Sequence, residues 1–352
     1  MKIAQVAPLY EAVPPKLYGG TERVVSHLTE ALVAEGHEVT LFAAADAGTG
    51  ADLVPVRDQA LRLDPAARKS DLAAHLNMLH DVRERADEFD VIHFHTEMLH
   101  FPFFESVAER TVTTLHGRLD MKDAPETYRR WHRFPLVSIS YSQRAPMPSA
   151  HWLGNVQHGL DPTSYQRPDR PRSDYLAFLG RISREKRPDR AIAIAHAVGM
   201  PLKIAAKVDE GDRDYFDGTI QPLLDEHDVE FLGEIGEADK MDFLGHAHAL
   251  LFPIDWPEPF GLVMIEAMAC GLPVVAWPHG AVPEVLDDGL TGFIVHDLPT
   301  AVSAVSRAAA LDRRTIRRVF EERFTARTMA QAYIELYGAL ARPRAHAHLN
   351  NA

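Results

Sequence analysis

Two glutamates separated by seven residues, Glu258 and Glu266, stand in the segment of this sequence best suited to ligand chemistry. A short apolar run precedes them. The pattern after it predicts a loop that holds Glu258 and a helix that begins near Gly261, with Glu266 about two turns from its start. The free amides of Phe260, Gly261 and Leu262 would donate to oxygen-rich ligands. Since carboxylates accept hydrogen bonds from vicinal hydroxyls, the segment indicates recognition of a sugar or a ribose.

Two cations follow another apolar run in the segment Gly180–Lys186. Gly180 allows the chain to turn tightly after a strand, which would place Arg181 and Lys186 at the mouth of a ligand site. A planar guanidinium and a point-charged ammonium together suit a diphosphate. An ordinary charged surface loop after a strand would show the same residues, so both readings stay open here.

The elements that must position these residues alternate between strands and helices. In the first half, strands are predicted at residues 2–6, 38–44, 91–94, 111–115 and 136–139, with helices at 22–34 and within 66–88. In the second half, strands are predicted at 175–179, 202–206, 229–232, 249–252 and 273–276, with helices at 188–198 and 261–269. This alternation is typical of α/β units whose parallel sheets are covered on both faces.

A segment rich in glycine and proline, residues 159–173, interrupts this alternation and is interpreted as an interdomain linker. We therefore expect a first domain over 1–165 and a second over 166–324, with a helix over about 325–342 that packs back on the first domain. Two open α/β units in tandem place a cleft between them. Ligands bind such sheets at the carboxyl ends of the strands, which would face this cleft.

Composition excludes several classes of protein. The net charge is −13 and neither half is basic, which disfavours nucleic-acid binding and contact with an anionic membrane. No run approaches the roughly 20 apolar residues that span a bilayer. Cys270 is the single cysteine among 352 residues, so an internal disulfide is excluded and a reducing compartment is favoured. We expect a cytoplasmic protein.

Patterns typical of metal and cofactor sites are weak. Asp212-Arg213-Asp214 has the form of a D-x-D metal motif, but it lies in a polar acidic stretch where a solvated loop explains it better. His93 and His95 share one face of a strand and lack the spacing of a zinc site, which favours packing or cleft-lining roles. Glycine motifs of dehydrogenases and phosphate loops are absent from the sequence. We expect no metal and no cofactor.

A resemblance to a known family rests on several motifs in order along nearly the whole chain. The segment 258–266, with its continuation to Val275, resembles the E-x7-E signature of retaining GT-B glycosyltransferases, family 4. Further motifs that resemble this family are Gly19-Gly20-Thr21-Glu22, Gly36–Thr40, His158–Asp161, Gly180-Arg181 with Lys186, and 283–285 with 289–292. The resemblance implies a GT-B architecture: two Rossmann-like domains whose parallel sheets face each other across a cleft.

The resemblance also implies roles on the diphosphate and nucleotide. The amides of Gly19 and Gly20 would approach the diphosphate closely, and Arg181 and Lys186 would neutralise it as it leaves. Glu266 would bind the ribose hydroxyls. The base would lie against the backbone of Gly233, Glu234 and Ile235.

On the sugar side, the resemblance implies that Glu258 and the amides of Phe260, Gly261 and Leu262 hold the donor hydroxyls. His116, at the end of a predicted strand, resembles the family histidine that contacts the donor sugar near its anomeric carbon. Departures from the family pattern are His158 and Arg187, where many relatives have Asn and Gly, and the segment 206–209, which replaces a glycine-rich turn. Lys207 in that segment is either an added cation or a surface lysine.

The reaction implied by the resemblance is transfer of a hexose with retention, from a nucleotide-sugar to an acceptor. A UDP-sugar is the default donor of the family, with no metal required. The acidic charge favours a soluble small-molecule or glycan acceptor. Two alternatives stay open: a nucleotide-sugar epimerase or hydrolase of the same fold, and a non-catalytic protein that binds nucleotide-sugars.

Overall fold

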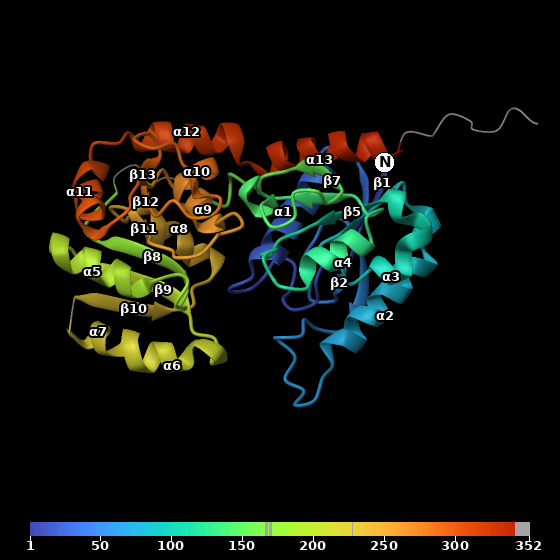
Figure 1. The fold of residues 1–352 in the computed structure, drawn as a ribbon, viewed down its shortest axis with the longest axis horizontal. Helices are drawn as coiled ribbons and strands as arrows, with labels where there is room; N and C mark the ends of the chain where they lie inside the picture. Colours follow the sequence, from blue (N-terminus) through green and yellow to red (C-terminus); the bar gives the residue numbers. More distant parts are fainter. Residues whose placement is uncertain (166–167, 169–170, 227, 342–352) are drawn as a thin grey trace, which may run out of the picture.

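A computed structural model describes residues 1–165, 168, 171–226 and 228–341. Within these ranges the chain forms two parallel sheets, one in each half (Figure 1). The expected domain boundary at 165/166 and the expected helix end at 342 each include a residue outside the described ranges.

The first sheet has seven parallel strands in the order β3-β2-β1-β4-β5-β6-β7. This is a doubly wound arrangement whose strand order reverses between β1 and β4. The strands are β1 (Lys2–Val6), β2 (Glu38–Ala44), β3 (Asp52–Arg57), β4 (Val91–Phe94), β5 (Thr111–Thr114), β6 (Leu136–Ser138) and β7 (Trp152–Asn155). The helices and short helical turns among them are α1 (Gly20–Ala34), α2 (Asp71–Glu84), η1 (Ala86–Glu88), α3 (Phe101–Phe104), η2 (Glu105–Arg110), α4 (Ala124–Arg130) and η3 (Ser142–Arg144).

The second sheet has six parallel strands in the order β10-β9-β8-β11-β12-β13, with its reversal between β8 and β11. Its strands are β8 (Leu176–Arg181), β9 (Leu202–Lys207), β10 (Val229–Gly233), β11 (Leu250–Phe252), β12 (Val274–Ala276) and β13 (Gly292–Ile294). The helical segments are α5 (Pro188–Val198), η4 (Glu210–Asp212), α6 (Arg213–Tyr215), η5 (Phe216–Ile220), α7 (Gln221–Glu226), α8 (Glu237–Gly245), α9 (Leu262–Ala269), α10 (Val282–Val285), α11 (Leu298–Ala308) and α12 (Arg313–Arg323).

The last helix, α13 (Ala326–Ala341), leaves the second half of the molecule and lies along the first (Figure 1). Its buried residues Met329, Tyr333 and Tyr337 pack in one cluster with Ile3 of β1 and Leu28 of α1. The end of the chain therefore completes the core of the first domain, because these apolar side chains recur at helical spacing on one face.

The two chain crossings between the domains touch each other. Leu160 forms a bridge with Thr325: the Leu160 amide donates to the Phe324 carbonyl at 2.9 Å, and the Ala326 amide donates to the Leu160 carbonyl at 2.8 Å. Gly159 lies so close that a Cβ there would be 2.2 Å from the Thr325 carbonyl oxygen. Glycine is needed at this crossing because any side chain would meet backbone that cannot move away.

Three strands were not predicted from the sequence: β3, β7 and β13. Among the described residues, each lies at the edge of its sheet and pairs with a strand on one flank. β3 and β7 are only partly buried, so their residues do not form the continuous apolar runs of central strands, and β13 has three residues. Within 66–88, the helix proper is confined to Asp71–Glu84, where the Ser70 side chain caps its first turn.

The close crossing at Gly159 yields a stability prediction. Gly159→Ala should lower the free energy of unfolding by about 1–3 kcal/mol, because the added methyl must displace backbone. Gly338→Ala is the matched control, since a Cβ at this helical glycine meets nothing within 4 Å. It should be stabilising by up to about 1 kcal/mol through helix propensity. Denaturant unfolding of both variants measures this, and equal stability of the two would contradict the role assigned to the crossing.

Candidate functional site

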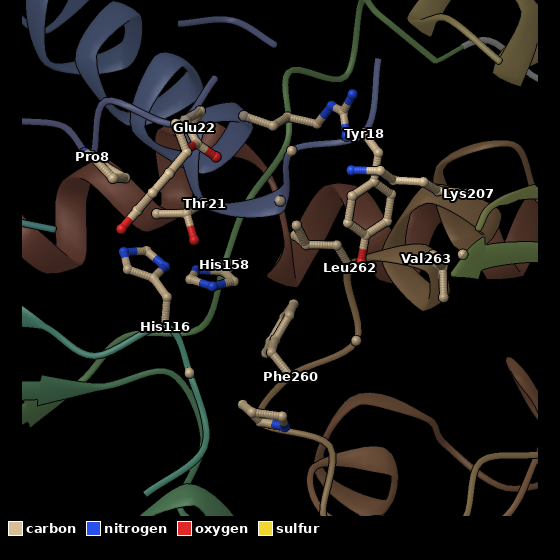
Figure 2. A pocket seen from close by; sticks show the side chains of 18 of the residues that line it. Pro8, Tyr18, Thr21, Glu22, His116, His158, Lys207, Phe260, Leu262 and Val263 are labelled. Atoms are coloured by element: carbon tan, nitrogen blue, oxygen red, sulfur yellow. The ribbon is translucent and has the colours of Figure 1, made fainter. Parts of the chain in front are cut away.

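A cavity of about 720 Å³ lies between the two domains, at the carboxyl ends of both sheets. The first domain lines it with the loops after β1, β4, β5 and β7 and the start of α1, and the second domain with the ends of β8, β9 and β11 and the start of α9. Figure 2 shows Thr21, His116 and His158 turned towards one space, with Phe260 and Leu262 facing them from the second domain. In both sheets, the strands between which the order reverses end at this cavity. Ligands bind such sheets at this position.

Glu258 lies in the loop after β11 and is 8% exposed. The Lys186 ammonium pairs with its Oε2, and the Trp256 indole donates to the same oxygen at 3.0 Å. Lys186 also sits 4.8 Å from the centre of the Trp256 ring, a cation–π contact that fixes the ammonium further. The structure therefore brings together Lys186 and Glu258, which the sequence had assigned to two separate motifs.

Glu266 is the fifth residue of α9, little more than one turn from its start, and is 1% exposed. Its Oε1 is 2.8 Å from Lys240 Nζ, 3.0 Å from the Tyr165 hydroxyl and 3.7 Å from Arg23 Nη1. Burial alone would raise the pKa of Glu266, but the two cations, Lys240 first, lower it below its usual value. The carboxylate is thus charged at neutral pH.

The two carboxylates share one arrangement. Within the described residues, the protein contacts of Glu258 go to Oε2 and those of Glu266 go to Oε1. Among the residues that the structure describes, each group thus has one anchored oxygen and one without a side-chain partner, and both residues line the cavity. This geometry suits binding of hydroxyls by fixed carboxylates.

Arg181 does not join Lys186 at the cavity. It is the last residue of β8, and its guanidinium reaches Asp209 at 3.4 Å and Asp212 at 3.7 Å. Lys207, the strand neighbour of Arg181, lines the cavity instead. Lys207 also pairs with Asp209, at 3.0 Å. The Asp209 carboxylate therefore holds both cations beside the cavity.

Most of the other predicted residues line the cavity: Gly19, Gly20, Glu234, Ile235, Phe260, Gly261 and Leu262. Gly233 is not among the described lining residues, but it makes the turn into Glu234 and Ile235 with a positive φ of 69°. Gly19 precedes α1, where a Cβ would lie 2.7 Å from Pro15. Its lack of a side chain is thus required by local packing, whether or not a ligand approaches.

His116 follows β5 and faces the cavity beside His158, whose ring stacks on it with 5.2 Å between centroids. Its Nε2 is 2.9 Å from His95 Nδ1. Burial lowers the pKa of His116 to about 3, so the ring is neutral at physiological pH. The group at the cavity is an imidazole that exchanges hydrogen bonds, not a cation.

Glu97 fixes the loop that carries His116. Its Oε1 accepts hydrogen bonds from the amides of His116 at 3.0 Å and Gly117 at 3.2 Å, and its Oε2 accepts one from the Tyr128 hydroxyl at 3.2 Å. Burial raises the pKa of Glu97 despite these donors. Sequence reasoning missed this residue, and it also missed Arg23, Tyr165 and Lys240, because their contacts join positions far apart in the chain.

The described part of the chain contains no group of three or more His, Cys, Asp or Glu side chains placed to hold a metal ion. Asp212, one end of the D-x-D sequence, is paired with Arg181 instead. No helix within the described ranges has the length and apolar character to cross a membrane.

Comparison with known proteins places the chain among glycosyltransferases. The family model for glycosyltransferase family 4 matches residues 18–203, and that for glycosyl transferases group 1 matches 165–322. The glycogen synthase of Mycobacterium tuberculosis is 27% identical over 97% of this chain and 95% of its own. AviGT4, a glycosyltransferase of avilamycin A biosynthesis, is 25% identical with a TM-score of 0.74 and covers 97% of this chain and 98% of its own.

A further solved structure, Anabaena HepE in complex with UDP and glucose, has the same fold with a TM-score of 0.73 at 20% identity, over 96% of this chain and 100% of its own. With the two doubly wound sheets and the cavity between them, these matches confirm the predicted GT-B fold. The chain belongs to glycosyltransferase family 4 and is a glycosyltransferase.

Proposed function

We propose that this glycosyltransferase moves a hexose from a nucleotide-sugar, by preference a UDP-sugar, to a soluble small-molecule or glycan acceptor. Transfer retains the anomeric configuration and needs no metal. The proposal rests on the carboxylates of Glu258 and Glu266, which line one cavity between the domains. Each has one oxygen held by neighbouring side chains. Carboxylates so held position vicinal hydroxyls of a donor without taking part in proton transfer.

The charges around the cavity support a diphosphate beside these carboxylates. Lys186 and Lys207 bring two ammonium groups to it, from the loop after β8 and from the end of β9. The amides at Gly19 and Gly20 face it from the other domain, at the start of α1. Cations and helix-start amides together stabilise the negative charge that grows on a leaving diphosphate. UDP as the nucleotide agrees with the UDP found in the HepE complex.

Retention is proposed from the resemblance to the retaining family. The pairing of Glu258 with Lys186 supports a mechanism in which this carboxylate is not a covalent nucleophile. In the proposed step, the bond from the anomeric carbon to the leaving phosphate oxygen breaks and the acceptor oxygen bonds on the same face. The acceptor's proton passes to that phosphate oxygen. Closure of the domains excludes water from the donor.

In the proposed reaction, Arg181 exchanges its carboxylate partners for the diphosphate. Its guanidinium is paired with Asp209 and Asp212. Because Arg181 and Lys207 are strand neighbours and share Asp209, a diphosphate beside Lys207 would compete with Asp209 for both cations. We propose that donor binding recruits Arg181 in this way.

Removing the ribose contact should weaken nucleotide binding. Glu266→Ala should raise the Kd for UDP by about tenfold or more, since a hydrogen bond to a charged group contributes about 1.5–3 kcal/mol. Glu237→Ala is the matched control. Glu237 is another acid of the same ion cluster, 2.8 Å from Arg23, and Glu237 is not among the described residues that line the cavity. Calorimetry with UDP should show less than about a twofold change for this control. Equal losses in both variants would mean that Glu266 acts only through the cluster.

Removing the guanidinium should slow the reaction. Arg181→Ala should lower kcat by about a hundredfold, the typical effect of removing one donor that stabilises transition-state charge. Arg184→Ala, in the loop that follows Arg181, is the control, because its guanidinium lies over the Tyr215 ring at 4.9 Å. UDP release with the acceptor found by screening measures both. A normal rate in Arg181→Ala would remove this residue from the mechanism.

The stereochemical outcome separates the proposed reaction from its alternatives. With an α-configured UDP-hexose and an acceptor, the product should be the α-glycoside, as read from the anomeric proton coupling by NMR during the reaction. A β-product would contradict retention. Incubation with the donor alone should leave it intact, whereas an epimerase or hydrolase would consume it. Tight donor binding without transfer to any acceptor in a broad panel would instead show a binding protein.

A further inference from the structure

A continuous run of buried polar side chains connects the last helix of the chain to His116 at the cavity. It passes from Tyr337 on α13 through His93 and Gln5 on β4 and β1, and then through His95. His93 and His95, for which the sequence indicated packing or cleft-lining roles, both belong to this run, and His95 also lines the cavity. Since each neutral imidazole has one N–H and one bare nitrogen, the direction of every bond limits the next.

At the outer end of the run, Gln5 and Tyr337 set the direction of the hydrogen bonds to His93. Gln5 Nε2 donates to the Tyr337 hydroxyl at 3.2 Å and also faces His93 Nδ1 at 3.4 Å. With the Gln5 amide in this orientation, a bare His93 Nδ1 faces the amide hydrogens and accepts from the Tyr337 hydroxyl at 2.6 Å. The proton of His93 is then on Nε2, which donates to Thr114 Oγ1 at 2.7 Å. Burial lowers the pKa of His93 well below its usual value, which agrees with one proton on this ring.

In the middle of the run, Gln5 and His95 pass the direction of the hydrogen bonds on to His116. Because the Gln5 amide nitrogen faces Tyr337, its oxygen faces His95, whose Nε2 lies at 2.8 Å and must donate. Burial also lowers the pKa of His95 well below its usual value, so the ring carries no second proton. His95 Nδ1 is therefore bare, and the contact of 2.9 Å to His116 is a bond that His116 Nε2 donates.

The inner end of the run is the cavity. With its proton on Nε2, His116 has a bare Nδ1. Among the described residues this buried atom has no hydrogen-bond partner, although His116 lines the cavity. Thr96 Oγ1 and His158 Nδ1, on two other lining residues, are also buried without a partner. A lone pair buried without a donor costs free energy unless a ligand or a water satisfies it.

We propose that Tyr337, Gln5 and His95 are positioning residues that hold His116 in the Nε2-protonated tautomer, so that its Nδ1 accepts a hydrogen bond from the substrate. The group it selects must carry a hydrogen to donate: a hydroxyl or an ammonium, and not a phosphate or carboxylate oxygen. That this group is a sugar hydroxyl rests on the proposed function. Figure 2 shows the His116 ring beside His158 at the open space that this group would enter.

The direct test is the protonation pattern of His116 in the ligand-free protein. Protein labelled with 15N-histidine is examined by two-bond 15N–1H correlation at neutral pH, with the His116→Asn variant used to identify the signals. We expect His116 Nε2 in the range of a protonated nitrogen and Nδ1 in that of a bare one. A protonated Nδ1 would overturn the proposal and leave the proposed transfer reaction unaffected.

A pair of variants on one helix tests the transmission. Tyr337→Phe removes the hydroxyl that fixes His93 and Gln5, and we expect both tautomers of His116 to appear and kcat to fall about fivefold to tenfold. Tyr333→Phe is the matched control, equally buried, whose hydroxyl meets Thr114 Oγ1 at 2.7 Å beyond the His93 donor. It should leave the His116 signals unchanged. Unchanged signals in folded Tyr337→Phe, or equal changes in both variants, would refute transmission from Tyr337.

Discussion

The carboxylate of Glu266 is the point at which three parts of the chain meet inside the molecule. Arg23 reaches it from the first domain, Tyr165 from the crossing between domains, and Lys240 from the helix before it in the second domain. A carboxylate this deeply buried is tolerated only when it is paired, and removing one partner of such a pair costs about 3–5 kcal/mol. The cluster therefore fixes how the domains face each other at the cavity, because its members cannot separate without leaving a buried charge.

The same constraint prepares the site for its ligand. Glu237 adds a second carboxylate to the cluster, 2.8 Å from Arg23, so the cations are shared and the contacts to Glu266 all fall on one of its oxygens. Elsewhere in the cavity, Lys186 pairs with one oxygen of Glu258 in the same way. Groups held in this way lose little freedom when a donor binds, which is how a preorganised site gains affinity. The cations proposed to bind the diphosphate are less preorganised, because Lys207 and Arg181 are both paired with Asp209.

The residues recognisable in the sequence are those whose role depends on local chain geometry. Gly261 and Glu266 are close in sequence, and the strand before them and the helix after them follow from apolar spacing alone. The partners of Glu266 leave no such trace: Tyr165 contacts it from 101 positions away, and no period or motif marks that pairing. The sequence also did not reveal the ion pairs of Arg181, because Asp209 and Asp212, the acids that pair with it, lie after the neighbouring strand. Edge strands such as β3 were not predicted, because they lack a continuous apolar run.

We propose that Glu258 and Glu266 hold a nucleotide-sugar through their unanchored oxygens. The most direct measurement is a crystal structure of the protein soaked with UDP. The ribose hydroxyls should lie within hydrogen-bond distance of Glu266 Oε2, with the diphosphate against Lys186 and the Arg181 guanidinium released from Asp209. UDP bound with its ribose away from Glu266, or outside this cavity, would contradict the claim.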